Sequence, residues 1–206
     1  PCFDSPCEEA GDDVRDYYKV APRYGTNEDL KHLFEEAHER GMHVILDLVP
    51  GHTSSECKWF KESCKAERNA YTDRYVWSDS IWNAPTGIGR ITGWLRGGYD
   101  RDGSAAVNFF TAQPALNYGF YEKDEGQSWQ QDIHDEGPVS TRKELLKIMK
   151  FWLSLGCDGF RVDMAGSLVK NDPNNIGIIS LWQEIFSALR PEYPEAAFVS
   201  EWGEPD

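Results

Sequence analysis

"GCDGFRVDMAG", residues 156–166, follows an apolar helical pattern and carries two charged residues inside what its composition predicts to be a strand. Successive side chains of a strand point to opposite faces, so Arg161 and Asp163 share one face. A carboxylate that is buried needs compensation, which the guanidinium of Arg161 can supply. We therefore expect Asp163 to stay ionised at neutral pH.

A helix followed at once by a strand is predicted in the first quarter of the chain. Residues 26–40 carry apolar side chains at helical spacing. Thr26 and Asp29 match a capping box at the start, and Gly41 is a stop signal at the end. The near-continuous apolar run in "MHVILDLV", residues 42–49, predicts a strand buried on both faces of a parallel sheet.

The same helix-then-strand unit recurs twice. A second helix is predicted over 141–155, with Thr141 and Glu144 as its capping box, and the strand quoted first follows it. A third helix, at residues 178–190, leads into the strand "AAFVSEWG", residues 196–203. Repetition of this unit predicts an α/β fold with a parallel sheet.

A long segment, residues 53–140, separates the first predicted strand from the second helix. A structureless loop of that length is uncommon in a compact domain, so we interpret the segment as an inserted, aromatic-rich subdomain. It holds five of the eight tryptophans, namely Trp59, Trp77, Trp82, Trp94 and Trp129.

Composition limits the classes of partner. The net charge of −14 disfavours nucleic acid and anionic membranes, whereas a neutral substrate is compatible with it. The sequence contains no run of 18 apolar residues, so no transmembrane helix is predicted. Five cysteines cannot all pair within one chain, which gives a slight preference for a reducing compartment such as the cytoplasm without placing the protein. Cys57 and Cys64 lack the usual zinc-ligand spacing.

Polar residues stand at the ends of all three predicted strands, namely Asp47 and His52, Arg161 and Asp163, and Glu201. In parallel α/β folds, ligands bind where the carboxyl ends of the strands converge. Each residue alone has a simpler explanation: Arg161 and Asp163 suit a structural ion pair, and His52 suits a loop histidine. Their order on three successive strand ends favours a common site.

Two carboxylates with divided roles are what glycoside hydrolysis requires. Asp163, held ionised, can attack the sugar carbon, and Glu201 can protonate the leaving oxygen. We expect Glu201 to keep its proton because its own strand has no basic residue and Trp202 is an apolar neighbour.

Four stretches resemble the catalytic domain of the alpha-amylase family of glycoside hydrolases. They are "DDVRDYYKVAPRYGTNEDLKHLFEEAHERGMHVILDLVPGH", "NFFTAQPALNYG", "GCDGFRVDMA" and "AAFVSEWG". The resemblance covers almost the whole chain, and "GFRVD" is its most specific part. It implies a partial (β/α)8 TIM barrel with a subdomain after the third strand, so that 1–52 and 141–206 are barrel parts and 53–140 is the insertion.

The resemblance also implies a role for each residue at the strand ends. Asp163 would be the nucleophile and Glu201 the general acid/base of a retaining hydrolase that acts on alpha-glucosidic bonds. Arg161, His52 and Asp47 would bind substrate: Arg161 by orienting Asp163, His52 by hydrogen-bonding the sugar, and Asp47 as a support. The tryptophans of the insertion would mostly pack in its core, and some could stack on sugar.

The chain departs from the family pattern in several places. Asp12 stands where a substrate-stacking tyrosine is frequent, and Gly51 replaces an asparagine before His52. Some members hold structural calcium with that asparagine, so the glycine argues against calcium and no cofactor is expected. The later His-Asp pair of the family does not occur before Asp206.

The opening residues contain no Met and no signal-like segment. Outside 53–140, the chain has fewer than half of the about 250 residues of a full barrel. We therefore expect a piece of an enzyme that covers the third to fifth strands and is inactive alone. A transglycosylase of the same family and a non-catalytic amylase-like binding module remain alternatives, while a metal-dependent hydrolase has only His52 as a strand-end histidine.

Overall fold

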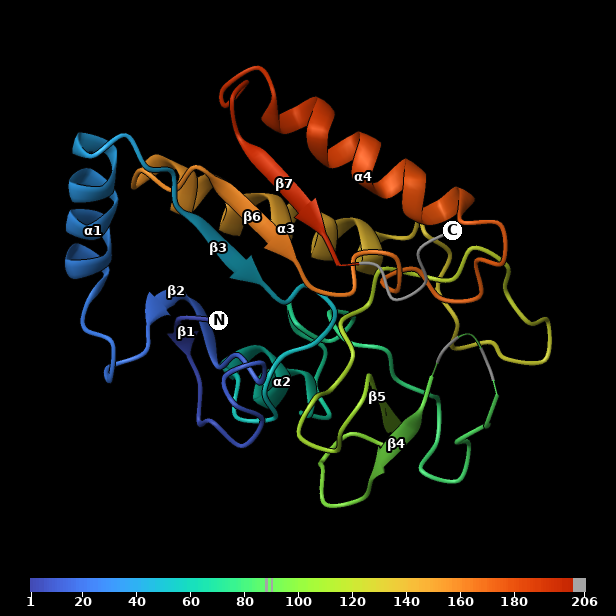
Figure 1. The fold of residues 1–206 in the computed structure, drawn as a ribbon. Helices are drawn as coiled ribbons and strands as arrows, with labels where there is room; N and C mark the ends of the chain where they lie inside the picture. The colour runs from blue at the N-terminus through green and yellow to red at the C-terminus, as the bar shows by residue number, and fades with distance from the viewer. Residues whose placement is uncertain (88, 90, 202–206) are drawn as a thin grey trace.

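A three-stranded parallel sheet organises the chain. The computed structural model describes residues 1–87, 89 and 91–201. The sheet has the order β3–β6–β7, side by side in Figure 1. Its strands are β3 (Ile45–Leu48), β6 (Gly159–Val162) and β7 (Ala197–Ser200). All three pair in parallel, and the register sets Arg161 between Asp47 and Val199.

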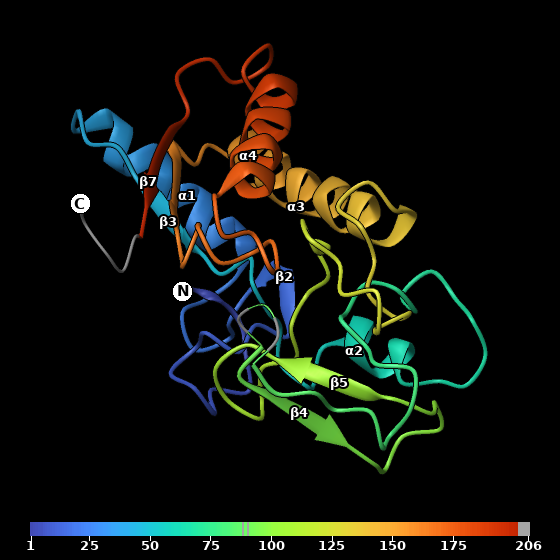
Figure 2. The ribbon, with the colours of Figure 1, turned by 90° about the vertical axis from the view of Figure 1, so that its right-hand side faces the viewer.

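A helix precedes each of these strands, which confirms the three predicted helix-then-strand units. The helices are α1 (Asn27–Glu39), α3 (Glu136–Ser154) and α4 (Ile176–Leu189). Figure 2 shows α3 and α4 on one side of the sheet. Thr26 and Asp29 form the predicted capping box, and Gly41, at φ +71°, follows the end of α1. None of the described helices has the length and apolar character needed to cross a bilayer.

The start of α3 differs from its prediction. The helix begins at Glu136, five residues before Thr141, whose hydroxyl donates to the carbonyl of Gly137 at 3.1 Å and caps nothing. Gly137 and Pro138 resemble helix breakers, but they lie in the first turn, where the missing N–H of proline leaves no hydrogen bond unmade. The predicted stop at Gly156 is confirmed, at φ +109°.

Only one face of the parallel sheet is well covered. Leu46, Leu48 and Phe160 are buried in the core. Ile45 and Val199, on the other face, are 39% and 54% exposed. The prediction that the strand in 42–49 is buried on both faces is therefore wrong, because the described residues cover only the side on which the helices pack.

The residues between β3 and α3 form a region below the parallel sheet in Figure 1. It contains the short helix α2 (Lys58–Ser63) and an antiparallel hairpin of β4 (Gly93–Arg96) and β5 (Ser104–Val107). A second small antiparallel sheet, which the sequence pattern did not predict, joins β1 (Phe3–Asp4) to β2 (Asp16–Val20).

Four of the five tryptophans of this region are packed, as the core interpretation predicts. Trp77 is buried, and Trp59 stacks on Tyr17 at 5.7 Å between ring centroids. Trp94 and Trp129 meet edge to face at 5.4 Å. Only Trp82, 87% exposed, keeps its ring free of the core.

Candidate active site at the ends of the parallel strands

Arg161 holds three carboxylates together. Its Nη1 lies 2.8 Å from Oδ1 of Asp47 and 3.2 Å from Oδ1 of Asp163. Its Nη2 lies 2.8 Å from Oε2 of Glu201. The structure therefore brings together four of the five site residues predicted from the sequence.

Strand geometry explains why these side chains meet. Asp163 and Glu201 each follow the last residue of a strand, and their backbone N–H groups still continue the parallel ladder. The N–H of Asp163 donates to Leu48 at 2.8 Å, and that of Glu201 donates to Val162 at 2.9 Å. Period-two alternation then places Asp163 on the same open face as Arg161.

The protonation of the carboxylate pair is opposite to the sequence expectation. Burial, the largest cause, and the neighbouring Glu201 carboxylate together raise the pKa of Asp163 to about 7. The hydrogen bond with Asp163 lowers the pKa of Glu201, and the N–H of Met164, 3.3 Å away, and Arg161 act in the same direction. The pair thus keeps a shared proton mainly on Asp163.

The expected protonation of Asp163 and Glu201 was wrong because it considered only the charges within each strand. Glu201 has no basic residue in its own strand, but Arg161 reaches it from the adjacent strand. Arg161 in turn makes its shorter Nη1 contact with Asp47, so Asp163 receives less compensation than expected. Trp202, the expected apolar neighbour of Glu201, lies outside the described residues.

His52 does not join the carboxylate cluster through any hydrogen bond or ion pair among the described residues. It is 2% exposed, its Nδ1 lies 3.3 Å from Nδ2 of Asn108, and its ring meets Phe109 edge to face. Burial lowers its pKa to about 4, so the imidazole is neutral at pH 7. Because Nδ1 faces the amide N–H of Asn108, Nε2 carries the proton, and a hydrogen-bonding interaction with the backbone of Asp12 opposes the effect of burial on the His52 pKa.

Asp12 is a further acidic group near the site. Partial desolvation raises the pKa of Asp12, and the charge of Asp47 adds to the effect. The charge of Asp12 also raises the pKa of Asp163. In the sequence, Asp12 stands out only as a departure from a family pattern, because no periodicity shows where a loop residue lies relative to a strand end.

The surroundings of His52 do not fit a calcium ion. A Cβ added at Gly51 would lie 2.6 Å from Nδ2 of Asn108, so the Asn108 amide fills the space beside the glycine. Its Oδ1 is 3.2 Å from Nζ of Lys170, a side chain that is 2% exposed. Calcium needs six to eight oxygen ligands, whereas the amide oxygen of Asn108 beside the glycine already contacts a buried ammonium group.

Polar groups gathered at the carboxyl ends of successive parallel strands are typical of TIM-barrel enzymes. Solved structures that resemble this chain are likewise TIM-barrel enzymes. Residues 1–203 match the family model "Alpha amylase, catalytic domain". The chain belongs to the alpha-amylase family.

Individual relatives carry several activities in their names. An oligo-1,6-glucosidase of Heyndrickxia coagulans is 38% identical over 172 residues, which are 82% of this chain and 28% of the relative. A trehalose synthase/amylase TreS of Mycolicibacterium smegmatis is 32% identical over 98% of this chain and 32% of its own length. The crystal structure of trehalose-6-phosphate hydrolase of Bacillus licheniformis superposes with a TM-score of 0.80 at 28% identity, covering all of this chain and 37% of that one. The chain therefore spans about a third of the length of these relatives.

Proposed function

We propose that this chain supplies the catalytic carboxylates of a retaining glycosidase that acts on alpha-glucosidic bonds. The supporting observation is the hydrogen-bonded pair of Asp163 and Glu201 at adjacent strand ends, with Arg161 bonded to both. We further propose that residues 1–52 and 141–206 are parts of a (β/α)8 barrel, with 53–140 inserted after its third strand. The parallel order β3–β6–β7 supports this division.

In the proposed reaction, a carboxylate oxygen of Asp163 forms a bond to the anomeric carbon as the glycosidic bond breaks. Glu201 gives its proton to the departing oxygen. Glu201 then takes a proton from the water that attacks the anomeric carbon, and Asp163 leaves with the electrons of its bond to the sugar. Because the free pair keeps its proton mainly on Asp163, the proton must pass to Glu201 before the first step.

Arg161 and His52 have distinct roles in this proposal. Arg161 keeps three carboxylates in one place and stabilises Asp163 once its proton has moved. His52, neutral and with its proton on Nε2, is suited to donate to a sugar hydroxyl. His52 pairs with Ala115 in a β-bridge, which ties the 53–140 segment to the end of β3 and supports a role for that segment as one wall of the site.

Two substitutions in the complete gene product test the division of roles. Alpha-glucosyl fluoride needs no proton for its leaving group, whereas maltose does. Glu201→Gln should lose maltose hydrolysis but still form the glucosyl-enzyme from the fluoride, which gives a burst of fluoride release followed by slow turnover because the base of the second step is missing. Asp163→Asn should reduce both reactions by several orders of magnitude. The exposed Glu36→Gln is the matched control and should change neither rate. The reverse pattern would exchange the two roles, and unchanged rates in both site variants would place the site elsewhere.

The product mixture separates the alternatives. A retaining enzyme releases the alpha anomer first, which proton NMR detects before mutarotation. The trehalose synthase/amylase relative favours transglycosylation as the second candidate, and transfer to added glucose at the expense of hydrolysis would establish it. A binding module would turn over neither the fluoride nor maltose. We also propose that no calcium is needed, so that chelation with EGTA leaves the fluoride reaction unchanged.

A further inference from the structure

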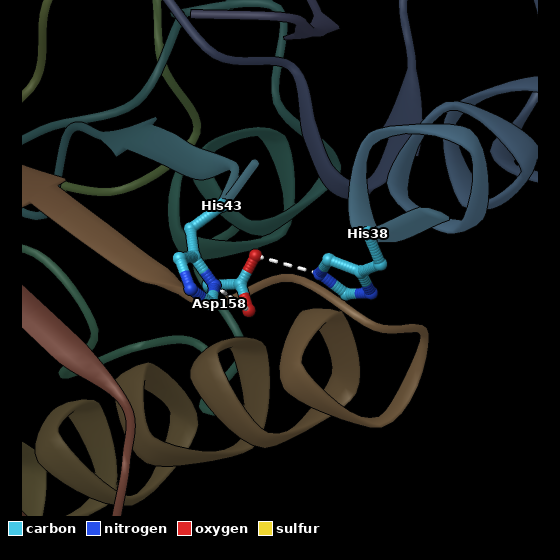
Figure 3. A group of neighbouring side chains, drawn as sticks. All are labelled: His38, His43 and Asp158. Atoms are coloured by element: carbon cyan, nitrogen blue, oxygen red, sulfur yellow. Dashed lines mark hydrogen bonds and ion pairs between the residues drawn. The ribbon is translucent and has the colours of Figure 1, made fainter. Parts of the chain in front are cut away.

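A second group of side chains lies at the opposite ends of the strands from the carboxylate pair. His38 is in the last turn of α1, His43 lies between α1 and β3, and Asp158 directly precedes β6. Figure 3 shows the two imidazoles, which come from different segments, beside the one carboxylate. Asp163 lies five positions after Asp158 along nearly extended chain, which corresponds to a distance of roughly 16 Å.

The donor atoms of these residues converge. Nε2 of His38 is 2.8 Å from Oδ2 of Asp158, and Nδ1 of His43 is 3.2 Å from Oδ1. One ligand atom from each of the three side chains can be chosen so that all lie within 4.8 Å of one another. Two ligands of a tetrahedral zinc ion lie about 3.3 Å apart, so the observed spacing requires only small side-chain adjustments.

The carboxylate is already oriented by the backbone. The N–H of Val44 donates to Oδ2 of Asp158 at 2.7 Å. An outer hydrogen bond of this kind fixes the direction of a metal-binding carboxylate.

The exposure of the group leaves room for a metal and its water ligands. His38 and His43 side chains are 40% and 82% exposed, and that of Asp158 is 22% exposed. Among the described residues, this is the one group of three or more histidine, cysteine and acidic side chains with such spacing. Two nitrogen donors with one carboxylate suit zinc or a neighbouring transition metal, not calcium or magnesium.

We propose that His38, His43 and Asp158 form a binding site for a divalent transition metal, with Zn²⁺ as the best-fitting ion. His38 Nε2, His43 Nδ1 and one Asp158 oxygen would be the protein ligands, and water would complete a four-coordinate shell. The ion would connect the end of α1 to the starts of β3 and β6. Because the ion would lie far from the carboxylate pair, its role would be to stabilise these segments. The proposed metal site therefore does not depend on the proposed glycosidase activity.

Zinc binding to the untagged chain tests this proposal. Isothermal titration should show one saturable site, and the melting temperature should rise with zinc concentration because the ion binds the folded state. His43→Gln should weaken zinc binding at least tenfold and remove most of the rise. This residue is the best position to change because its side chain is largely exposed, so the fold should tolerate glutamine.

His32→Gln is the matched control. His32 is an exposed histidine of α1 outside the group, with a side chain that is 68% exposed, so its loss should leave the zinc affinity unchanged. All five cysteines stay in both variants, so zinc held by thiols would bind to His43→Gln as to the wild type. Equal affinity in the wild type and His43→Gln, or no saturable binding to the wild type, would overturn the proposal.

Discussion

Arg161 and Asp47 face each other across the β3–β6 ladder, and Nη1 of the arginine lies 2.8 Å from Oδ1 of the aspartate. The same nitrogen is 3.2 Å from Asp163. Asp47 therefore competes with Asp163 for one N–H donor group. Burial is the main reason that the pKa of Asp163 is raised to about 7, and Arg161, which acts against this rise, is shared with Asp47.

Replacing Asp47 with Asn should release Arg161 toward Asp163. The Asp163 pKa should fall by about one unit or more, because a negative charge disappears nearby and the guanidinium becomes available. Carboxyl-carbon NMR titration of the wild type and Asp47→Asn measures this shift. Glu36→Gln removes an exposed carboxylate of α1 and should leave the Asp163 titration unchanged. An Asp163 pKa that stays the same or rises in Asp47→Asn would contradict this account.

Arg161→Gln should destabilise the folded chain most strongly above neutral pH. Without the guanidinium, three carboxylates would repel one another in the folded state, and this repulsion is relieved when the chain unfolds. The loss should be about 1–3 kcal/mol, less than for a fully buried pair because these groups are about one-third exposed. It should shrink as acid protonates the carboxylates.

Urea unfolding of Arg161→Gln at several pH values provides the measurement. The control is Arg40→Gln, which removes an exposed ion pair with Glu36 and should cost less than about 0.5 kcal/mol. A stability loss in Arg161→Gln that does not depend on pH would show that packing of the arginine, and not its charge, is responsible.

His52 should make the chain less stable in acid. Its pKa is lowered to about 4 in the folded state, whereas an unfolded histidine titrates near 6.5. The unfolded chain therefore binds the proton first, and stability falls as the pH decreases from neutrality to about 4, by up to about 3 kcal/mol. His52→Gln should remove this part of the pH dependence, whereas the exposed His32→Gln should retain it. Identical slopes in the two variants would exclude His52 as the cause.

Gly159→Ala should disrupt the pairing of β6 with β7. Gly159 has φ +151°, and an added Cβ would lie 1.9 Å from the carbonyl oxygen of Ala197. The expected cost exceeds about 3 kcal/mol, because the backbone of a paired strand must move. Gly97, at φ +69°, has nothing within 4 Å of an added Cβ, so Gly97→Ala isolates the backbone strain alone. Equal melting temperatures of the two variants would contradict the steric explanation.

Local patterns predicted the main helices and strands. The capping box of Thr26 and Asp29 and the stop at Gly156 act through neighbouring residues, so their meaning does not depend on distant contacts. The early start of α3 was missed because glycine and proline are tolerated in a first helical turn. The β1–β2 pair was missed because a two-residue strand has no periodicity to detect.

The sequence by itself determined that Arg161 and Asp163 share a face, because alternation along a strand is a local property of the backbone. Only the tertiary structure decided that Asp47 and Glu201 would share the same guanidinium, since the register between strands sets which side chains meet. The position of the proton shared by Asp163 and Glu201 followed from that register and from burial. Desolvation and Coulomb interactions act through space, so Asp163 and Glu201 acquired pKa shifts that neither strand carries alone.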